Sequence, residues 1–129
     1  MSLWITIATR VLAWSVVAMQ TGFGAMEIFA PRFVFDRVFI TYSATSAAPV
    51  WIETEKLARN MGLYNWFLAF GLLLSLVGRL GGAPTSQFFL LCVGVAGAFG
   101  LFSVSLSMAF GAQLVLGLMT VLLLRMGRP

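Results

Sequence analysis

The chain has 129 residues, 60% of them hydrophobic and 9% charged, and its mean hydropathy is +0.99. A soluble domain usually carries roughly 25% charged residues, so this composition excludes a soluble globular protein and predicts one that is solvated by lipid. The net charge of +4 comes from basic residues scattered at the ends of apolar segments. That placement predicts contact with membrane head groups, and nucleic acid is not expected as a partner.

The residue types that bind metals are scarce. The chain has no His, four acids and a single cysteine, Cys92, so we expect no metal site, no cofactor and no internal disulfide. A spanning helix needs about 20 mostly apolar residues, which leaves room for four spans and no soluble domain. We therefore predict an all-α fold, a bundle of four transmembrane helices forming one domain over residues 1–129.

The first predicted span covers residues 11–29. We interpret it as a transmembrane helix rather than a signal peptide, because the apolar run is long and no small-x-small cleavage site precedes a soluble domain. Gln20, Gly24 and Glu27 are separated by four and then three residues and therefore share one face of this helix. We expect that face to point into the bundle.

Residues 30–56 form the largest predicted connection. Pro31 is expected to end the first span, because it cannot continue the helical hydrogen-bond ladder. The residues that follow mix aromatic and charged side chains, which is typical of the membrane–water interface. We predict an interfacial loop with room for a short helix or strand-like piece, which either anchors the bundle or forms a lid over a site.

The second predicted span, residues 57–77, carries polar side chains in its first half. Asn60 and Tyr64 are four residues apart and share one face, whereas Asn65 lies about 100° further round the helix. A compact turn rich in glycine follows, over residues 78–84.

The third predicted span, residues 86–103, contains Gly94, Gly97 and Gly100 at three-residue spacing. Such a groove lets a neighbouring helix approach closely, so we predict a packing role for these glycines.

The fourth predicted span, residues 108–124, follows a short serine-rich break. Gln113, Gly117 and Thr120 form one polar stripe on it, again at spacings of four and three. Because lipid is a poor partner for polar groups, the polar faces of the first, second and fourth spans are expected to meet inside the bundle.

One family has similar motifs. The sequence NMGLYN at residues 60–65, with FLA and GL shortly after it, resembles the N-x-G-L-Y-N-x-F-L-A-x-G-L segment of the uncharacterised bacterial integral membrane proteins catalogued as domain of unknown function one-three-zero-four. The MEIF sequence at residues 26–29, the FF and VAG sequences of the third span, and Gln113 resemble further elements of that family. The resemblance implies four spans and the bacterial inner membrane, and it implies no activity.

Glu27 is the residue that most needs an explanation. A carboxylate at the centre of a span costs about 2.5–3.5 kcal/mol, so such a group is usually paired, protonated or functional. One interpretation places Glu27 at the interface, paired with Arg32 or Arg59. The other buries it among polar side chains of the bundle, namely Gln20, Asn60, Tyr64, Asn65 and Gln113.

The second interpretation predicts a membrane-embedded enzyme, or a binding site, for a hydrophobic, lipid-like small molecule. Glu27 would serve as general acid or base and Tyr64 would donate to a developing oxyanion. The polar head of the substrate would be oriented by Asn60, Asn65 and Gln113, and Trp14 or Trp66 would face cationic intermediates. Isomerisation, cyclisation, hydration or hydrolysis would suit such a site.

Two other functions fit the sequence. A proton-coupled exporter of lipophilic cations is one, because small multidrug transporters also have four short spans with a glutamate in the first. With four spans the basic residues divide evenly, which permits dual topology and an antiparallel homodimer: Arg10, Arg79, Arg125 and Arg128 lie on one side, and Arg32, Arg37, Lys56 and Arg59 on the other. The other is an accessory subunit whose exposed Gly97 face docks on a larger membrane complex.

Overall fold

The computed structural model describes residues 3–38, 48–103 and 107–126. Every element in these ranges is a helix: α1 (Leu3–Phe29), α2 (Pro31–Val38), α3 (Ala48–Leu76), α4 (Ala83–Ser103) and α5 (Met108–Met126). The predicted all-α class is confirmed. Within the described ranges, α1, α4 and α5 are long and apolar enough to cross a membrane.

The segment predicted as a loop over residues 30–56 is largely helical where the structure describes it. The first helix ends at Phe29, as expected from Pro31, but Pro31 itself opens α2. Proline is well tolerated there, because the first residues of a helix have no intrahelical partner for their N–H groups. The last part of the predicted loop belongs to α3, which begins at Ala48. Residues 39–47 lie outside the described part of the chain.

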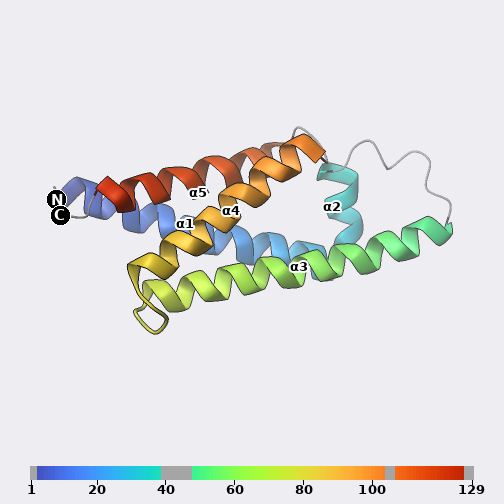
Figure 1. The fold of residues 1–129 in the computed structure, drawn as a ribbon. Coiled ribbons are helices and arrows are strands. Elements are labelled where there is room, and N and C mark those ends of the chain that lie inside the picture. Colours follow the sequence, from blue (N-terminus) through green and yellow to red (C-terminus); the bar gives the residue numbers. More distant parts are fainter. Residues whose placement is uncertain (1–2, 39–47, 104–106, 127–129) are drawn as a thin grey trace.

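The four long helices form an up-down-up-down bundle (Figure 1). Helix α1 packs against α3 and α5, and α4 packs against α3 and α5, so that each long helix has two neighbours. The start of α1, the end of α5 and the α3–α4 turn lie at one end of the bundle, whereas α2 runs across the other end (Figure 1). The α3–α4 turn reverses the chain through Gly78, Gly81 and Gly82, whose φ angles of 74°, 63° and 65° favour glycine.

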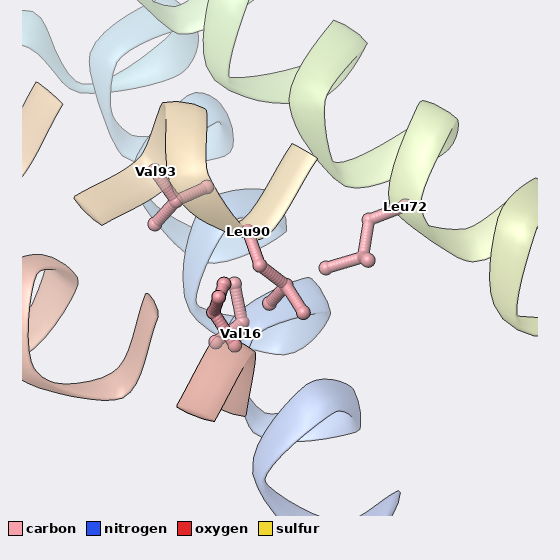
Figure 2. Packing of buried hydrophobic residues seen from close by; sticks show 5 residues of the cluster. Val16, Leu72, Leu90 and Val93 are labelled. Atoms are coloured by element: carbon pink, nitrogen blue, oxygen red, sulfur yellow. The ribbon is translucent and has the colours of Figure 1, made fainter. Parts of the chain in front are cut away.

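The apolar core is small and lies between the helices (Figure 2). Each long helix contributes to it: Val16 from α1, Leu72 from α3, Leu90 and Val93 from α4, and Val121 from α5. The outer surface is also apolar, with large side chains such as Phe70, Phe99 and Leu122 exposed. An exterior of this kind is what lipid contact requires, and water would disfavour it.

Glycines set the two closest helix contacts. On α1 and α3, a Cβ atom added to Gly62 would lie 2.7 Å from the carbonyl oxygen of Gly24. On α4 and α5, a Cβ atom on Gly117 would lie 2.8 Å from the carbonyl oxygen of Leu90. The three-residue spacing on α4 predicted a packing role for Gly94, Gly97 and Gly100. All three are buried against α5, which confirms this role.

Candidate functional site

The inner face of α1 carries the polar side chains that the helical spacing predicted to point inward. Gln20, Gly24 and Glu27 are all buried, and Gln20 is fully so, with 0% exposure. The matching stripe on α5, formed by Gln113, Gly117 and Thr120, is buried as well. Two predicted polar faces therefore do meet inside the bundle.

Glu27 is held by a single hydrogen bond from α3. The side-chain amide of Asn65 donates through Nδ2 to Glu27 Oε2 at 2.7 Å. Gly62, one turn before Asn65 on α3, makes the approach possible, because a Cβ atom at this position would lie 3.0 Å from the Cβ atom of Glu27. The other carboxylate oxygen, Oε1, accepts no hydrogen bond within the described part of the chain.

The interfacial alternative for Glu27 paired it with Arg32 or Arg59, and Arg59 is engaged elsewhere. Its guanidinium donates to the carbonyl oxygen of Ile28 at 2.6 Å and to Oε1 of Glu55 at 2.7 Å. The first bond satisfies one of the carbonyl groups that have no intrahelical partner at the C-terminal end of α1. Arg59 thus caps a helix, and Glu27 takes Asn65 as its partner.

A cavity of about 70 Å³ adjoins Glu27, which we call the Glu27 cavity. Its two polar walls are Glu27 and Gln113. The other walls are apolar and come from α1, α2 and α5: Phe23, Met26, Phe33, Val34, Ala109 and Phe110. Because α2 supplies Phe33 and Val34, this short helix covers one side of the cavity.

Gln113 is oriented by a second interhelical hydrogen bond. Its Nε2 donates to Oε1 of Gln20 at 2.9 Å, joining α5 to α1. Gln20 Nε2 is buried and has no hydrogen-bond partner among the described residues. Because one N–H of its amide nitrogen is donated to Gln20, Gln113 keeps its carbonyl oxygen available as an acceptor.

The structure separates the other predicted site residues from Glu27. Tyr64 is 59% exposed and packs edge-on against Phe67, with ring centroids 6.4 Å apart. Asn60 is exposed on the same outer face of α3. The expectation that these two side chains face Glu27 is corrected: α3 turns toward α1 the face that carries Gly62 and Asn65, because only a glycine allows such close contact.

The two predicted tryptophans also lie away from the carboxylate. Trp66 Nε1 donates to the carbonyl oxygen of Thr21 at 3.1 Å, and its ring stacks at a tilt on Phe29 with centroids 6.1 Å apart. Trp14 is 47% exposed and lines a different cavity, toward the opposite end of the bundle. Neither contributes a wall to the Glu27 cavity.

The apolar walls of the Glu27 cavity were not predicted, although the sequence contained a signal for some of them. Phe23 lies three residues after Gln20 and four before Glu27, and therefore on the same helical face. Ala109 and Phe110 lie four and three residues before Gln113, and therefore on the same face of α5 as Gln113. The contribution of Phe33 and Val34 had no such signal, since it depends on how α2 folds back over the bundle.

These features define a small helical membrane protein whose core joins polar side chains from three helices beside an apolar cavity. The chain belongs to the family described as protein of unknown function (DUF1304), whose family model matches residues 14–125 and thus most of its length. The predicted family is therefore confirmed. No curated protein and no solved structure matches the chain.

Proposed function

We propose that this chain is a membrane-embedded enzyme that binds the polar head of a hydrophobic, lipid-like molecule in the Glu27 cavity. The observation that carries the proposal is that one carboxylate and one amide line a cavity whose other walls are apolar. Ligand sites typically combine such walls with a few well-placed polar groups. The cavity volume of about 70 Å³ suits a head group, and the apolar remainder of the molecule would extend toward the lipid.

The hydrogen-bonding pattern favours a head group that donates. Glu27 Oε1 and the carbonyl oxygen of Gln113 are both acceptors, because Asn65 and Gln20 engage the opposite atoms of these side chains. A hydroxyl or an amine would complement two acceptors. An isolated carbonyl or phosphate has no proton for these two oxygens and would need a donor in their place, such as a protonated Glu27 or the second N–H of Gln113.

Glu27 is the proposed acid–base group, and Asn65 its positioning residue. Asn65 fixes the carboxylate through Oε2, which leaves Oε1 available to the substrate. A carboxyl group oriented in this way can take a proton from one atom of a bound molecule and return it to another. Isomerisation, cyclisation or hydration of a lipid-like alcohol or amine requires such a transfer. Tyr64 and Asn60 are left out of this proposal, because both side chains are exposed.

The test is native mass spectrometry of protein extracted gently from its own membrane, with identification of the retained small molecule. Two variants should lose the retained molecule. Glu27→Gln removes the acid–base group, and Ala109→Phe fills the cavity while leaving the carboxylate of Glu27 in the sequence. Glu55→Gln is the matched control, since Glu55 pairs with Arg59 outside the cavity. Retention of the molecule by both cavity variants, at wild-type thermal stability, would contradict the proposal.

A proton-coupled exporter of lipophilic cations is the second candidate, and one observation favours it. The Glu27 cavity places three phenyl rings, those of Phe23, Phe33 and Phe110, around a carboxylate. A cation is attracted by aromatic faces as well as by a carboxylate. Proteoliposomes distinguish the two functions: an exporter uses an imposed proton gradient to move a lipophilic cation in exchange for protons and leaves the cation unaltered, whereas an enzyme releases a changed product.

The accessory-subunit alternative loses its proposed docking surface. It required the Gly97 face of α4 to be open, and this face is occupied by α5 within the same chain. A Cβ atom on Gly97 would lie 2.7 Å from the carbonyl oxygen of Phe110. We therefore do not propose it further.

We further propose that α3, which contains most of the second predicted span, also crosses the membrane, so that the chain has four spans, and that the protein resides in the bacterial inner membrane. Support comes from the position of α3 alongside α1 and from its exposed apolar side chains Leu63, Phe67 and Phe70. Single cysteines at Trp4 and Leu80, in a Cys92→Ser background, test the span count. Four spans place both positions on the same side for a membrane-impermeant thiol reagent, whereas a non-spanning α3 places them on opposite sides.

A further inference from the structure

A second and larger cavity lies at the α3–α4 turn, with Gly78 and Gly82 among its walls. Its volume is about 560 Å³, which lies within the range of roughly 300–1,000 Å³ typical of ligand sites. The residues that matter for its chemistry are Arg10, Trp14, Ser75, Gly82, Ser86 and Leu124. We call it the Arg10 cavity.

The hydroxyl groups of the Arg10 cavity are already used within the chain. Ser75 and Ser86 lie 2.6 Å apart, oxygen to oxygen, and both reach the carbonyl oxygen of Gly82, at 2.7 Å and 3.2 Å. Each serine hydroxyl has one proton, so the hydrogen bonds among Ser75, Ser86 and the Gly82 carbonyl oxygen use both hydroxyl protons. Thr9 donates its hydroxyl proton to the carbonyl oxygen of Ile5 at 2.7 Å. These groups hold the cavity wall in place and leave no hydroxyl proton for a ligand.

Two other side chains of the cavity have unused donors. Arg10 and Trp14 are four residues apart on α1, so they lie on one face of the helix. Within the described part of the chain neither makes a hydrogen bond, and Arg10 has no ion pair. A guanidinium group offers five N–H donors in a planar fork that matches phosphate, and the indole adds one more.

Charge at this end of the bundle favours an anion. The four acids of the sequence, Glu27, Asp36, Glu53 and Glu55, all fall within residues 27–55. Of these, Asp36 belongs to α2 and the others lie near the end of α1 and the start of α3, at the opposite end (Figure 1). Among described residues, the Arg10 end carries Arg10, Arg79 and Arg125 without an acid to balance them.

The position of Arg10 also fits a membrane surface. Arg10 lines the same cavity as Gly78 and Gly82 of the α3–α4 turn, and this turn marks the end of the bundle (Figure 1). Trp14 follows one turn deeper, where an amphipathic ring is typical of the head-group region. The cavity walls also include apolar side chains, among them Leu76 and Leu124.

We propose that the Arg10 cavity is a binding site for the phosphate of an anionic glycerophospholipid. Arg10 would bind two phosphate oxygens through its fork, and the indole N–H of Trp14 would donate to a third. The acyl chains would run along Ala13 and Leu124 toward the bilayer interior. This site is separate from the Glu27 cavity and does not depend on the function proposed there.

The experiment measures lipid retention by the full-length protein, using native mass spectrometry after exchange into nanodiscs. The nanodiscs contain equal amounts of phosphatidylglycerol and phosphatidylcholine, which differ in net charge. We expect wild-type protein to retain phosphatidylglycerol preferentially, and Arg10→Gln to weaken this retention roughly tenfold, as expected for the loss of hydrogen bonds to a charged group. Arg125→Gln, which removes an exposed charge at the same end, should retain the lipid.

Two further measurements keep the test decisive. Trp14→Phe keeps an aromatic side chain but replaces the indole, with its N–H, by a smaller phenyl ring, so it should weaken retention if Arg10→Gln does not fold. Inorganic phosphate is then added to the detergent-solubilised protein as a free anion. Displacement of the lipid by millimolar phosphate would assign the site to a soluble anion and overturn the lipid proposal. Equal losses in Arg10→Gln and Arg125→Gln would overturn it too, because they would indicate non-specific surface charge.

Discussion

Asn65 of α3 donates a 2.7 Å hydrogen bond to Glu27 of α1, across 38 positions in the sequence. The bond forms because Gly62, one turn earlier on α3, lets the two helices approach until no Cβ atom would fit between them. A buried carboxylate without a partner is costly in lipid, so this pair is important for stability as well as for the proposed function. The consequences can be tested separately.

Asn65→Leu should destabilise the fold by about 1–3 kcal/mol, because it leaves a buried oxygen of Glu27 without its hydrogen bond. Asn60→Leu is the matched control: it removes the same amide group from the exposed face of the same helix and should change stability by less than about 0.5 kcal/mol. The measurement is the free energy of unfolding in mixed detergent micelles. Equal effects would show that Asn65 does not hold Glu27 in the bundle.

A hydrophobic carbodiimide should modify Glu27, because such a reagent enters the apolar Glu27 cavity from the lipid and reacts with a carboxyl group there. Peptide mass spectrometry locates the adduct. Filling the cavity with Ala109→Phe should reduce the labelling of Glu27 several-fold. Unchanged labelling in a folded Ala109→Phe variant would mean that the reagent reaches Glu27 by another route, and that the cavity is not its access path.

Gly62→Ala should destabilise the α1–α3 contact by about 1–3 kcal/mol. The added Cβ atom would lie 2.7 Å from the carbonyl oxygen of Gly24, and backbone cannot move aside as a flexible side chain can. Gly22→Ala, on α1, has nothing within 4 Å of the added atom and should be neutral or slightly stabilising. Thermal unfolding followed by circular dichroism compares the two. A neutral Gly62→Ala would contradict the close crossing.

Gly117→Ala should weaken the α4–α5 contact by a similar amount, about 1–3 kcal/mol. Its Cβ atom would meet the backbone of α4 at Gly94 N and at Leu90 O, both at 2.8 Å. Gly111→Ala, two turns earlier on α5, meets nothing within 4 Å and serves as the control. Here the readout is the rate of proteolysis during heating, and the prediction fails if both variants behave alike.

Gln113→Leu should cost more stability than the double change Gln20→Leu with Gln113→Leu. The single change leaves the fully buried amide of Gln20 with no interhelical partner, at a cost of about 1–3 kcal/mol. The double change removes both polar groups, which can be nearly neutral. A double-mutant cycle of unfolding free energies measures the coupling. Additive effects would argue against the hydrogen bond between the two side chains.

Much of the fold could be predicted because hydropathy and helical spacing are local. The apolar runs located the ends of α4 and α5 closely, and the spacing of Gln20, Gly24 and Glu27 identified the inner face of α1. The three-residue spacing of the α4 glycines likewise predicted a close helix contact. The early starts of α1 and α3 were missed, since their first residues are less continuously apolar.

The site was harder to predict, because α3 carries polar groups on two faces. Asn60 and Tyr64 form one polar face and Asn65 lies on another, and nothing in their spacing says which one meets α1. The close approach at Gly62 selects the Asn65 face and leaves Tyr64 exposed. Within the NMGLYN motif, Asn65 therefore lies at the contact with α1, whereas Asn60 and Tyr64 are exposed.

The amino-acid sequence by itself determined that this is a helical membrane protein with inward polar stripes on its first and last long helices. The length and hydropathy of each apolar segment, and the spacing of its polar residues, depend only on residues that are close together in the sequence. Only the tertiary structure decided that Glu27 pairs with Asn65, that Gln20 pairs with Gln113, and that α2 closes one side of the cavity. These relationships depend on how each helix is rotated and which helix it lies beside, and the packing of glycines from distant segments sets both.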